Sequence, residues 1–193
     1  MNSIDVRQSD YRNDIDGLRA VAVLLIIVFH VNASWLPGVF VGVDMFFVIS
    51  GYLITGIVSR ELQSDQFSFG DFYHRRVQRI LPALWVLLLL VLLISWRLML
   101  PNDVEPLGKS ALWSSLAMAN VYFWKEVATD YFAPESAKMP LLHLWSLGVE
   151  EQFYLFWPAA LAAIWAISKD SARSISILLA LSVVFGATIL AEV

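Results

Sequence analysis

Residues 80–100, ILPALWVLLLLVLLISWRLML, form an almost entirely apolar run that contains one charged side chain, Arg97. A transmembrane α-helix needs about 20 mainly apolar residues, so this stretch has the length and composition to cross a bilayer. Pro82 falls in the first turn of the predicted helix, where a missing backbone N–H is tolerated. The stretch therefore predicts a membrane-spanning helix and an all-α fold class.

The composition of the whole chain also favours a membrane protein. Hydrophobic residues make up 59% and charged residues 16% of the 193 positions, whereas soluble domains are about a quarter charged. The charges are clustered rather than spread over a broad basic surface, so nucleic acid is not expected as a partner. The sequence has no cysteine, which excludes disulfides, thiolate metal sites and a cysteine acyl-enzyme. We expect no metal site.

Outward from residues 80–100, further apolar segments predict a polytopic bundle of about five or six transmembrane helices. Residues 101–109 are predicted to form a turn-rich loop, and the helix that follows it is short and polar enough to be buried, tilted or partly re-entrant. The predicted helices are 18–36, 39–58, 80–100, 110–124, 147–167 and 175–190. We expect residues 1–193 to form a single partial domain, because an apolar helix close to Val193 is typical of the N-terminal part of a larger bundle.

Arginines near the predicted helix ends set the expected orientation. Arg7, Arg12 and Arg19 flank the start of the first helix, and four more lie in the connection of residues 59–79. The N-terminus and this connection are therefore predicted to be cytoplasmic. Beyond the fourth helix the basic residues are evenly divided between the loops, and the orientation stays open.

Arg19 and His30 are the costly residues of the first helix. They are eleven positions apart, which at about 100° per residue places them on one helix face and roughly 16 Å apart along the axis. Arg19 alone fits a basic anchor at the membrane surface, and His30 alone fits a hydrogen bond to another helix. Ionisable groups that share a face inside a membrane more often line a cavity, and histidine can serve there as a general base.

Asp44 lies near the outer end of the second predicted helix, on the side where His30 ends the first. A carboxylate in this place can orient an imidazole and stabilise its protonated form. The alternative is an interfacial residue or a helix cap.

Arg75, Arg76 and Arg79 form a basic cluster before the third helix. If the helix begins a turn or two early, residues three and four apart become neighbours, and clustered guanidiniums bind phosphate well. The alternative is a cytoplasmic anchor that is attracted to anionic lipids.

Glu150 and Glu151 adjoin the fifth helix and project about 100° apart, so at most one of them can face the interior squarely. A carboxylate there can orient a base or bind a substrate hydroxyl. The alternative is an acidic first turn that the helix dipole stabilises.

Four segments together resemble the integral-membrane acyltransferase 3 family, which O-acetylates bacterial surface polysaccharides and related acceptors. They are YRNDIDGLRAVAVLLIIVFH, GVFVGVDMFFVISGYLI, FYHRRVQRILPAL and PLLHLWSLGVEEQFYLFWP, in this order within residues 11–158. Arg19 and His30 match the family's Arg/Lys–x10–His pair, and Arg76 and Arg79 match its Arg-x-x-Arg motif. The motifs look like those of the branch that often carries a C-terminal SGNH hydrolase-like domain.

The resemblance implies a membrane-bound O-acyltransferase of the bacterial inner membrane. It implies that acetyl-CoA or another acyl-CoA is the donor substrate, with no bound cofactor, and that a glycan hydroxyl, such as one of lipopolysaccharide O-antigen, is the acceptor. Catalytic roles are then expected for His30, Asp44 and Glu150, and donor-phosphate contacts for Arg19, Arg76 and Arg79, with Arg75 and Glu151 as further candidates.

Family members usually have about ten transmembrane helices, so this chain resembles their N-terminal portion. A separate or missing set of C-terminal helices and an SGNH domain are then expected partners. A truncated form without activity stays open, as does a proton-coupled transporter in which His30, Asp44 and Glu150 relay protons.

Overall fold

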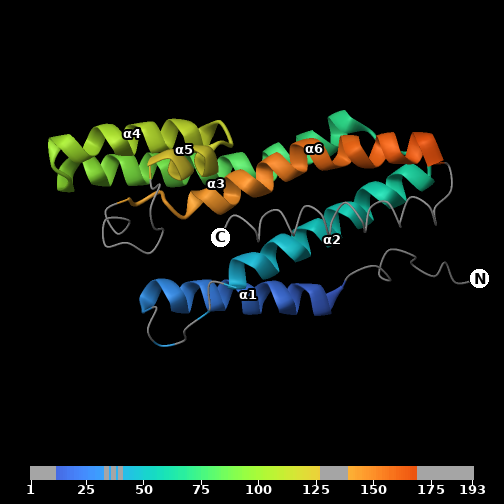
Figure 1. The fold of residues 1–193 in the computed structure, drawn as a ribbon, viewed down its shortest axis with the longest axis horizontal. Coiled ribbons are helices and arrows are strands. Elements are labelled where there is room, and N and C mark those ends of the chain that lie inside the picture. The colour runs from blue at the N-terminus through green and yellow to red at the C-terminus, as the bar shows by residue number, and fades with distance from the viewer. Residues whose placement is uncertain (1–11, 33–34, 36–37, 39–40, 127–138, 169–193) are drawn as a thin grey trace, which may run out of the picture. The chain divides into compact units, whose positions relative to one another are not determined.

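A computed structural model describes residues 12–32, 35, 38, 41–126 and 139–168 (Figure 1). These residues divide into two units, one ending at Leu53 and one beginning at Ile54, and each unit is described by itself. All regular elements in the described residues are α-helices, which confirms the all-α part of the predicted fold. Their bounds are α1 Asn13–Val31, α2 Val41–Gln63, α3 Phe69–Leu98, α4 Pro101–Ser115, α5 Ala119–Glu126 and α6 Leu144–Ser168. The predicted helix 175–190 lies outside the described residues.

In the first unit, α1 and the beginning of α2 pack closely at one glycine. A Cβ atom added to Gly42 would lie 2.9 Å from the carbonyl oxygen of Ala22 and 3.1 Å from a side-chain carbon of Ile26. Ala22 is fully buried. Small residues let two helix backbones approach in this way, and such contacts are frequent between membrane helices.

In the second unit, α3 is a 30-residue helix that begins at Phe69, eleven residues before the predicted start. The Ser68 side chain caps it by accepting a hydrogen bond from the Asp71 backbone N–H. Pro82 therefore lies in the helix interior and not in its first turn, which corrects the sequence-based prediction. Among the described helices, α2 and α3 are long and apolar enough to cross a membrane, judged by length and composition.

The prediction of one continuous helix over residues 110–124 is wrong, because the structure has two helices there. The prediction of a loop over residues 101–109 is also wrong. Helix α4 already begins at Pro101, because proline suits the first helical position. The chain then leaves the helix at Leu116, and Ala117 adopts a φ of 59° before α5 begins. Ser114 accommodates its hydroxyl within α4 by donating to the Ser110 carbonyl at 2.7 Å.

The break between α4 and α5 is held by a side chain of α6. The Gln152 amide nitrogen donates to the Ala117 carbonyl and to Asn120 Oδ1, both at 2.9 Å. The Asn120 amide donates back to Gln152 Oε1 at 3.2 Å. Next to this pair Gly148 allows close approach, since an added Cβ would lie 2.9 Å from Asn120 Oδ1.

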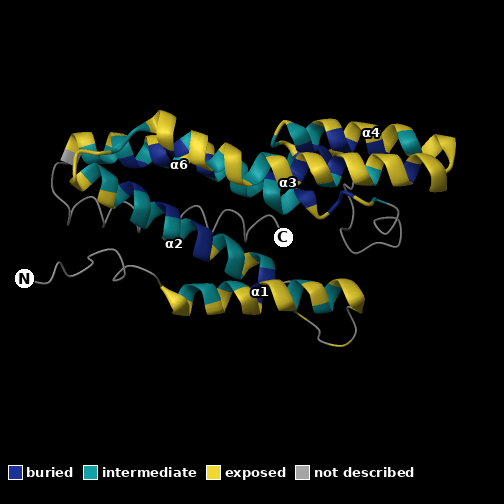
Figure 2. Cartoon of the chain, turned by 180° about the vertical axis from the view of Figure 1, so that it is seen from behind, coloured by how far each residue is buried: buried dark blue, intermediate teal, exposed yellow. Residues whose placement is uncertain are grey.

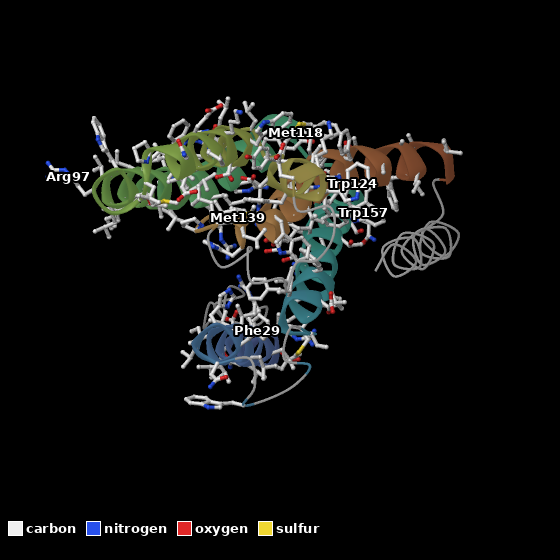
Figure 3. All side chains as sticks on the ribbon, turned by 60° about the vertical axis from the view of Figure 1, so that its left-hand side comes forward. Phe29, Arg97, Met118, Trp124, Met139 and Trp157 are labelled. Carbon is white, nitrogen blue, oxygen red and sulfur yellow. The ribbon has the colours of Figure 1, made fainter. Side chains whose placement is uncertain are left out.

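Two apolar clusters form the core of the second unit. The larger one joins α3, α4, α5 and the start of α6 through Leu84, Leu88, Leu107, Ala111, Ala119, Tyr122, Phe123, Leu141, Leu142 and Leu144. The smaller one joins the end of α2 to α3 and α6 through Ile54, Val58, Phe72, Tyr154 and Leu161. The opposite face of α3 exposes large apolar side chains such as Trp85, Leu89 and Leu93 (Figure 2). Figure 3 shows Arg97 pointing outward at the end of this helix.

Candidate functional site

Arg19 projects from the second turn of α1 and has two partners in the first unit. Its guanidinium lies 3.6 Å from an Asp16 carboxylate oxygen, and its central carbon lies 5.7 Å from the centre of the Phe46 ring of α2. A shallow groove runs beside it, lined by Arg19, Ala20, Val23, Leu24 and Phe46. The groove thus combines one cation with an apolar floor.

His30 lies in the last turn of α1, at the end opposite Arg19. Its Nδ1 atom is 2.8 Å from the backbone carbonyl oxygen of Ile26. A carbonyl oxygen only accepts hydrogen bonds, so Nδ1 must carry the proton. The neutral ring then has its free lone pair on Nε2, and the side chain is exposed. In this tautomer Nε2 can accept a proton, as a general base does.

Asp44 lies in the first turn of α2 and is exposed. Within the described part of the chain, no hydrogen bond or ion pair joins it to His30. The imidazole is instead oriented by the Ile26 carbonyl of its own helix. The orienting role of Asp44 stays a prediction.

A contact at the start of α1 was not predicted from the sequence. Arg12 donates to both carboxylate oxygens of Asp14, at 2.9 and 2.7 Å, and to the Tyr52 hydroxyl of α2 at 3.2 Å. These hydrogen bonds lower the pKa of the Asp14 carboxyl to about 2. Nothing in the sequence around Arg12 indicated that Tyr52, 40 positions away, would be its partner.

The basic cluster of α3 divides into three different environments in the second unit. Arg75 forms an ion pair with Glu61 of α2 at 2.9 Å. Arg79 is exposed, and no carboxylate of the described residues pairs with it. Of the three, Arg79 is therefore the most available for an anionic ligand.

Arg76 is partly buried between two aromatic rings. Its guanidinium carbon lies 5.6 Å from the centre of the Phe72 ring and 5.7 Å from that of Tyr154 on α6. Its Nε atom is buried, and no acceptor in the described residues bonds to it. The contacts of Arg76 with rings on α3 and α6 were not foreseen.

Glu150 accepts a hydrogen bond from the Tyr154 hydroxyl, one turn later on α6. The helix begins at Leu144, so Glu150 and Glu151 lie in its second turn. The alternative of an acidic first turn is therefore wrong. The four-residue spacing of Glu150 and Tyr154 was visible in the sequence and could have indicated this pair.

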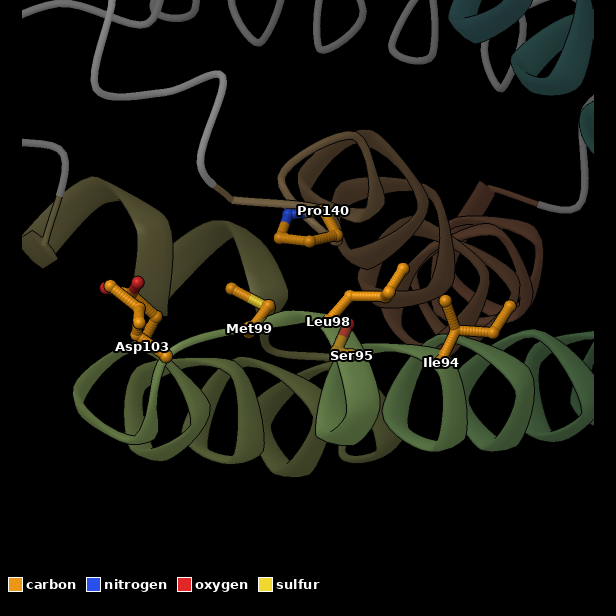
Figure 4. Close-up of a pocket in the computed structure, with 7 residues that line it drawn as sticks. Ile94, Ser95, Leu98, Met99, Asp103 and Pro140 are labelled. Atoms are coloured by element: carbon orange, nitrogen blue, oxygen red, sulfur yellow. The ribbon is translucent and has the colours of Figure 1, made fainter.

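A separate hollow lies at the other end of α3 (Figure 4). It is lined by Ile94, Ser95, Leu98, Met99, Leu100, Asp103 and Pro140. None of the predicted site residues belongs to it.

Comparison with known proteins identifies the family. A family model described as an acyltransferase domain matches residues 12–192. The chain belongs to the acyltransferase 3 family. Within these matched residues lie Arg19, His30, Asp44, the basic cluster of α3 and both glutamates of α6.

Curated relatives of this acyltransferase 3 chain are named as O-acetyltransferases or as putative O-acetyltransferases. It is 41% identical over 152 residues to the peptidoglycan O-acetyltransferase OatA of Listeria monocytogenes, covering 78% of this chain and 24% of that protein. It is 38% identical over 164 residues to the putative peptidoglycan O-acetyltransferase YrhL of Bacillus subtilis, covering 84% of this chain and 26% of that protein. The chain thus spans about a quarter of the length of these relatives. No solved structure matches it.

Proposed function

We propose that this acyltransferase 3 chain carries the donor-side residues of a membrane-bound O-acetyltransferase. The reaction would move an acetyl group from acetyl-CoA to a hydroxyl group of peptidoglycan. The observation that carries the proposal is the hydrogen bond of His30 Nδ1 to the Ile26 carbonyl, which leaves Nε2 as a proton acceptor. Relatives named as peptidoglycan O-acetyltransferases support peptidoglycan rather than O-antigen as the acceptor.

In the proposed reaction, His30 Nε2 takes the proton from the acceptor hydroxyl as that oxygen attacks the thioester carbonyl. A carbon–oxygen bond forms, the carbon–sulfur bond breaks, and the coenzyme A thiolate leaves. The imidazolium then returns its proton to the thiolate. Asp44 and Glu150 are proposed as carboxylates that stabilise the cation or hold the acceptor.

The donor's phosphates are proposed to bind at the basic residues on the cytoplasmic side. Arg79 is suited to this role by its exposure, and Arg19 by the apolar groove beside it. A guanidinium can hold a phosphate through two parallel hydrogen bonds. The pantetheine arm would then extend from Arg19 toward His30. These two residues are roughly 16 Å apart along the axis of α1.

The proposed location is the bacterial plasma membrane, with the N-terminus in the cytoplasm and more than one span. Two candidate spans, α2 and α3, support this placement. The arginines of residues 59–79 support a cytoplasmic connection between them.

Acetyl transfer can be tested in membranes from cells that express the chain. Acetyl-CoA labelled in the acetyl group is supplied, and base-labile label is measured in purified peptidoglycan. The proposal expects label that depends on the chain and is lowered by about 100-fold or more with His30→Ala. Label in lipopolysaccharide alone would contradict the acceptor assignment.

A transporter is the competing function. It would show proton-coupled uptake into vesicles without acyl-CoA. Such uptake together with no acetyl transfer would reject the proposed enzyme.

A further inference from the structure

Arg76 and its partners form two facing pairs of side chains. Phe72 and Arg76 are one turn apart on α3, and Glu150 and Tyr154 are one turn apart on α6. Residues four apart lie on the same side of a helix, so each pair presents one surface to the other. The guanidinium of Arg76 lies over both rings, and the Tyr154 hydroxyl donates to Glu150.

This arrangement limits what Arg76 can bind. A phosphate contact of the bidentate kind uses two N–H groups along one edge of the guanidinium. The Nε atom of Arg76 is buried, so a bidentate contact through Nε and one Nη atom is closed to a ligand without rearrangement. Arg79 has no such restriction, because its side chain is exposed.

The same arrangement gives Arg76 another task. A cation over the face of an aromatic ring is attracted by the negative charge of that face, and it fixes the plane of the ring. Fixing the Tyr154 ring fixes the direction of its hydroxyl, which donates to Glu150.

We propose that Arg76 is a positioning residue that holds the Glu150 carboxylate in place through Tyr154, and that it does not contact the donor's phosphates. The direct phosphate contact in this cluster is Arg79. The inference rests on the proposed function for the role of Glu150 in the reaction. The Arg76–Tyr154–Glu150 unit itself does not depend on that function.

The unit is tested first by thermal unfolding of the detergent-solubilised chain. The variants are Arg76→Gln, Tyr154→Phe and the double variant; Tyr154→Phe removes only the hydroxyl and keeps the ring. If the two residues act as one unit, each single variant lowers the melting temperature by about 2–4 °C and the double variant lowers it by little more. If the losses in melting temperature of the two single variants add up in the double variant, Arg76 and Tyr154 do not act together and the proposal is overturned.

The role of Arg76 is tested by binding and kinetics in membranes that contain the whole chain. Arg79→Gln is expected to weaken coenzyme A binding and raise the donor KM by about tenfold, as loss of a charge-assisted hydrogen bond does. Arg76→Gln and Tyr154→Phe should leave the donor KM within about twofold and lower kcat by about tenfold. Arg76→Lys keeps the charge without the planar stack and should recover only part of kcat.

The outcomes separate the two proposals. A tenfold higher donor KM with unchanged kcat in Arg76→Gln would overturn the positioning role and make Arg76 a phosphate contact. If the unchanged chain neither binds coenzyme A nor transfers acetyl, the proposed function fails. The unfolding measurements then decide whether Arg76, Tyr154 and Glu150 are coupled.

Discussion

Three arginines of one helix have three different surroundings, and these surroundings decide what each side chain can do. Arg75 is neutralised by Glu61, Arg76 is enclosed by two rings, and Arg79 faces outward. A charge in a cluster is therefore available to a ligand only if its neighbours leave its hydrogen-bond donors free. The number of basic residues in a cluster does not by itself measure a binding site.

Replacing His30 with alanine should lower acetyl transfer by about 100-fold or more, because general base catalysis contributes about that much. The neighbouring Val31→Ala is the matched control, since Val31 is exposed and apolar. Transfer of labelled acetyl to peptidoglycan, normalised to the amount of chain in the membrane, measures both variants. Transfer by His30→Ala at the level of Val31→Ala would remove His30 from the mechanism.

The Arg12–Asp14 contact should make the first unit sensitive to acid. Asp14 precedes the predicted span, and the hydrogen bonds from Arg12 lower its pKa from about 3.8 to about 2. A lowered pKa in the folded state contributes stability that is present above pH 4 and is lost as the pH falls toward 2. The pair is exposed, so high salt should reduce the contribution.

The measurement is thermal unfolding between pH 5 and pH 2, at low and high salt, for the unchanged chain and for Asp14→Asn. The Asn variant should lose less stability over this interval. Identical pH dependence of the two proteins would show that the contact contributes nothing to folding.

Single residues of the candidate site could be predicted where a motif or a helical spacing identified them. Arg19 and His30 stood out as ionisable residues in an apolar helix, and the structure adds the tautomer of His30. Tyr52, Glu61 and Tyr154 were not foreseen, because a partner in a distant segment depends on how helices pack. Helical periodicity indicates which face of a helix is apolar, but it does not show which other helix packs against that face.

At the scale of elements, two glycines of α2 have opposite surroundings. Gly42 meets the Ala22 backbone, whereas a Cβ atom added to Gly56 would have no atom within 4 Å beyond its own helix. Gly42 therefore allows close packing of α1 and α2, whereas no close packing requires a glycine at position 56.

Gly42→Ala should therefore destabilise the packing of α1 on α2 by about 1–3 kcal/mol, because the clash is with backbone that cannot rotate away. Gly56→Ala is the matched control and should stabilise α2 by up to about 1 kcal/mol, the difference in helix propensity. Chemical or thermal unfolding of both variants measures the effect. Equal stability of the two variants would contradict the close contact at Gly42.

Gln152→Leu tests the support of the α4–α5 break. It removes the donor to Ala117 and both bonds to Asn120, leaving partly buried polar groups unpaired. The expected loss is about 1–3 kcal/mol in the free energy of unfolding. Gln63→Leu, at the exposed end of α2, is the matched control and should change stability little. A comparable loss in both would assign the effect to hydrophobicity.

Element boundaries followed local signals that the apolar pattern did not contain. Helix α3 begins early because Ser68 caps it, although residues 69–79 carry Asp71 and three arginines. Helix α4 begins at a proline and breaks at Ala117, where a side chain of α6 compensates the interruption. The apolar pattern located the centres of α1, α2 and α6 but not those of α4 and α5, and caps and tertiary hydrogen bonds determined where helices end.

At the scale of the whole molecule, orientation in the membrane is the property to measure. Residues 1–193 contain no cysteine, so a single cysteine introduced into this chain can be labelled without background from its other residues. Gln66→Cys, between α2 and α3, should be protected from a membrane-impermeant maleimide in intact cells. Asn102→Cys, at the start of α4, should be labelled. The reverse pattern would invert the proposed topology and place the basic cluster outside the cell.

The composition of α3 also bears on how the protein is synthesised. During translation, the translocon meets three arginines, at positions 75, 76 and 79, directly before an apolar segment of spanning length. In the proposed topology, such a segment would enter the bilayer by its own hydrophobicity, and the arginines would retain its leading end on the cytoplasmic side. Helix α1 has a weaker signal, because it carries Asp14, Asp16 and Arg19 at its start. The middle of the nascent chain would thus fix its own orientation without depending on the order in which the earlier helices insert.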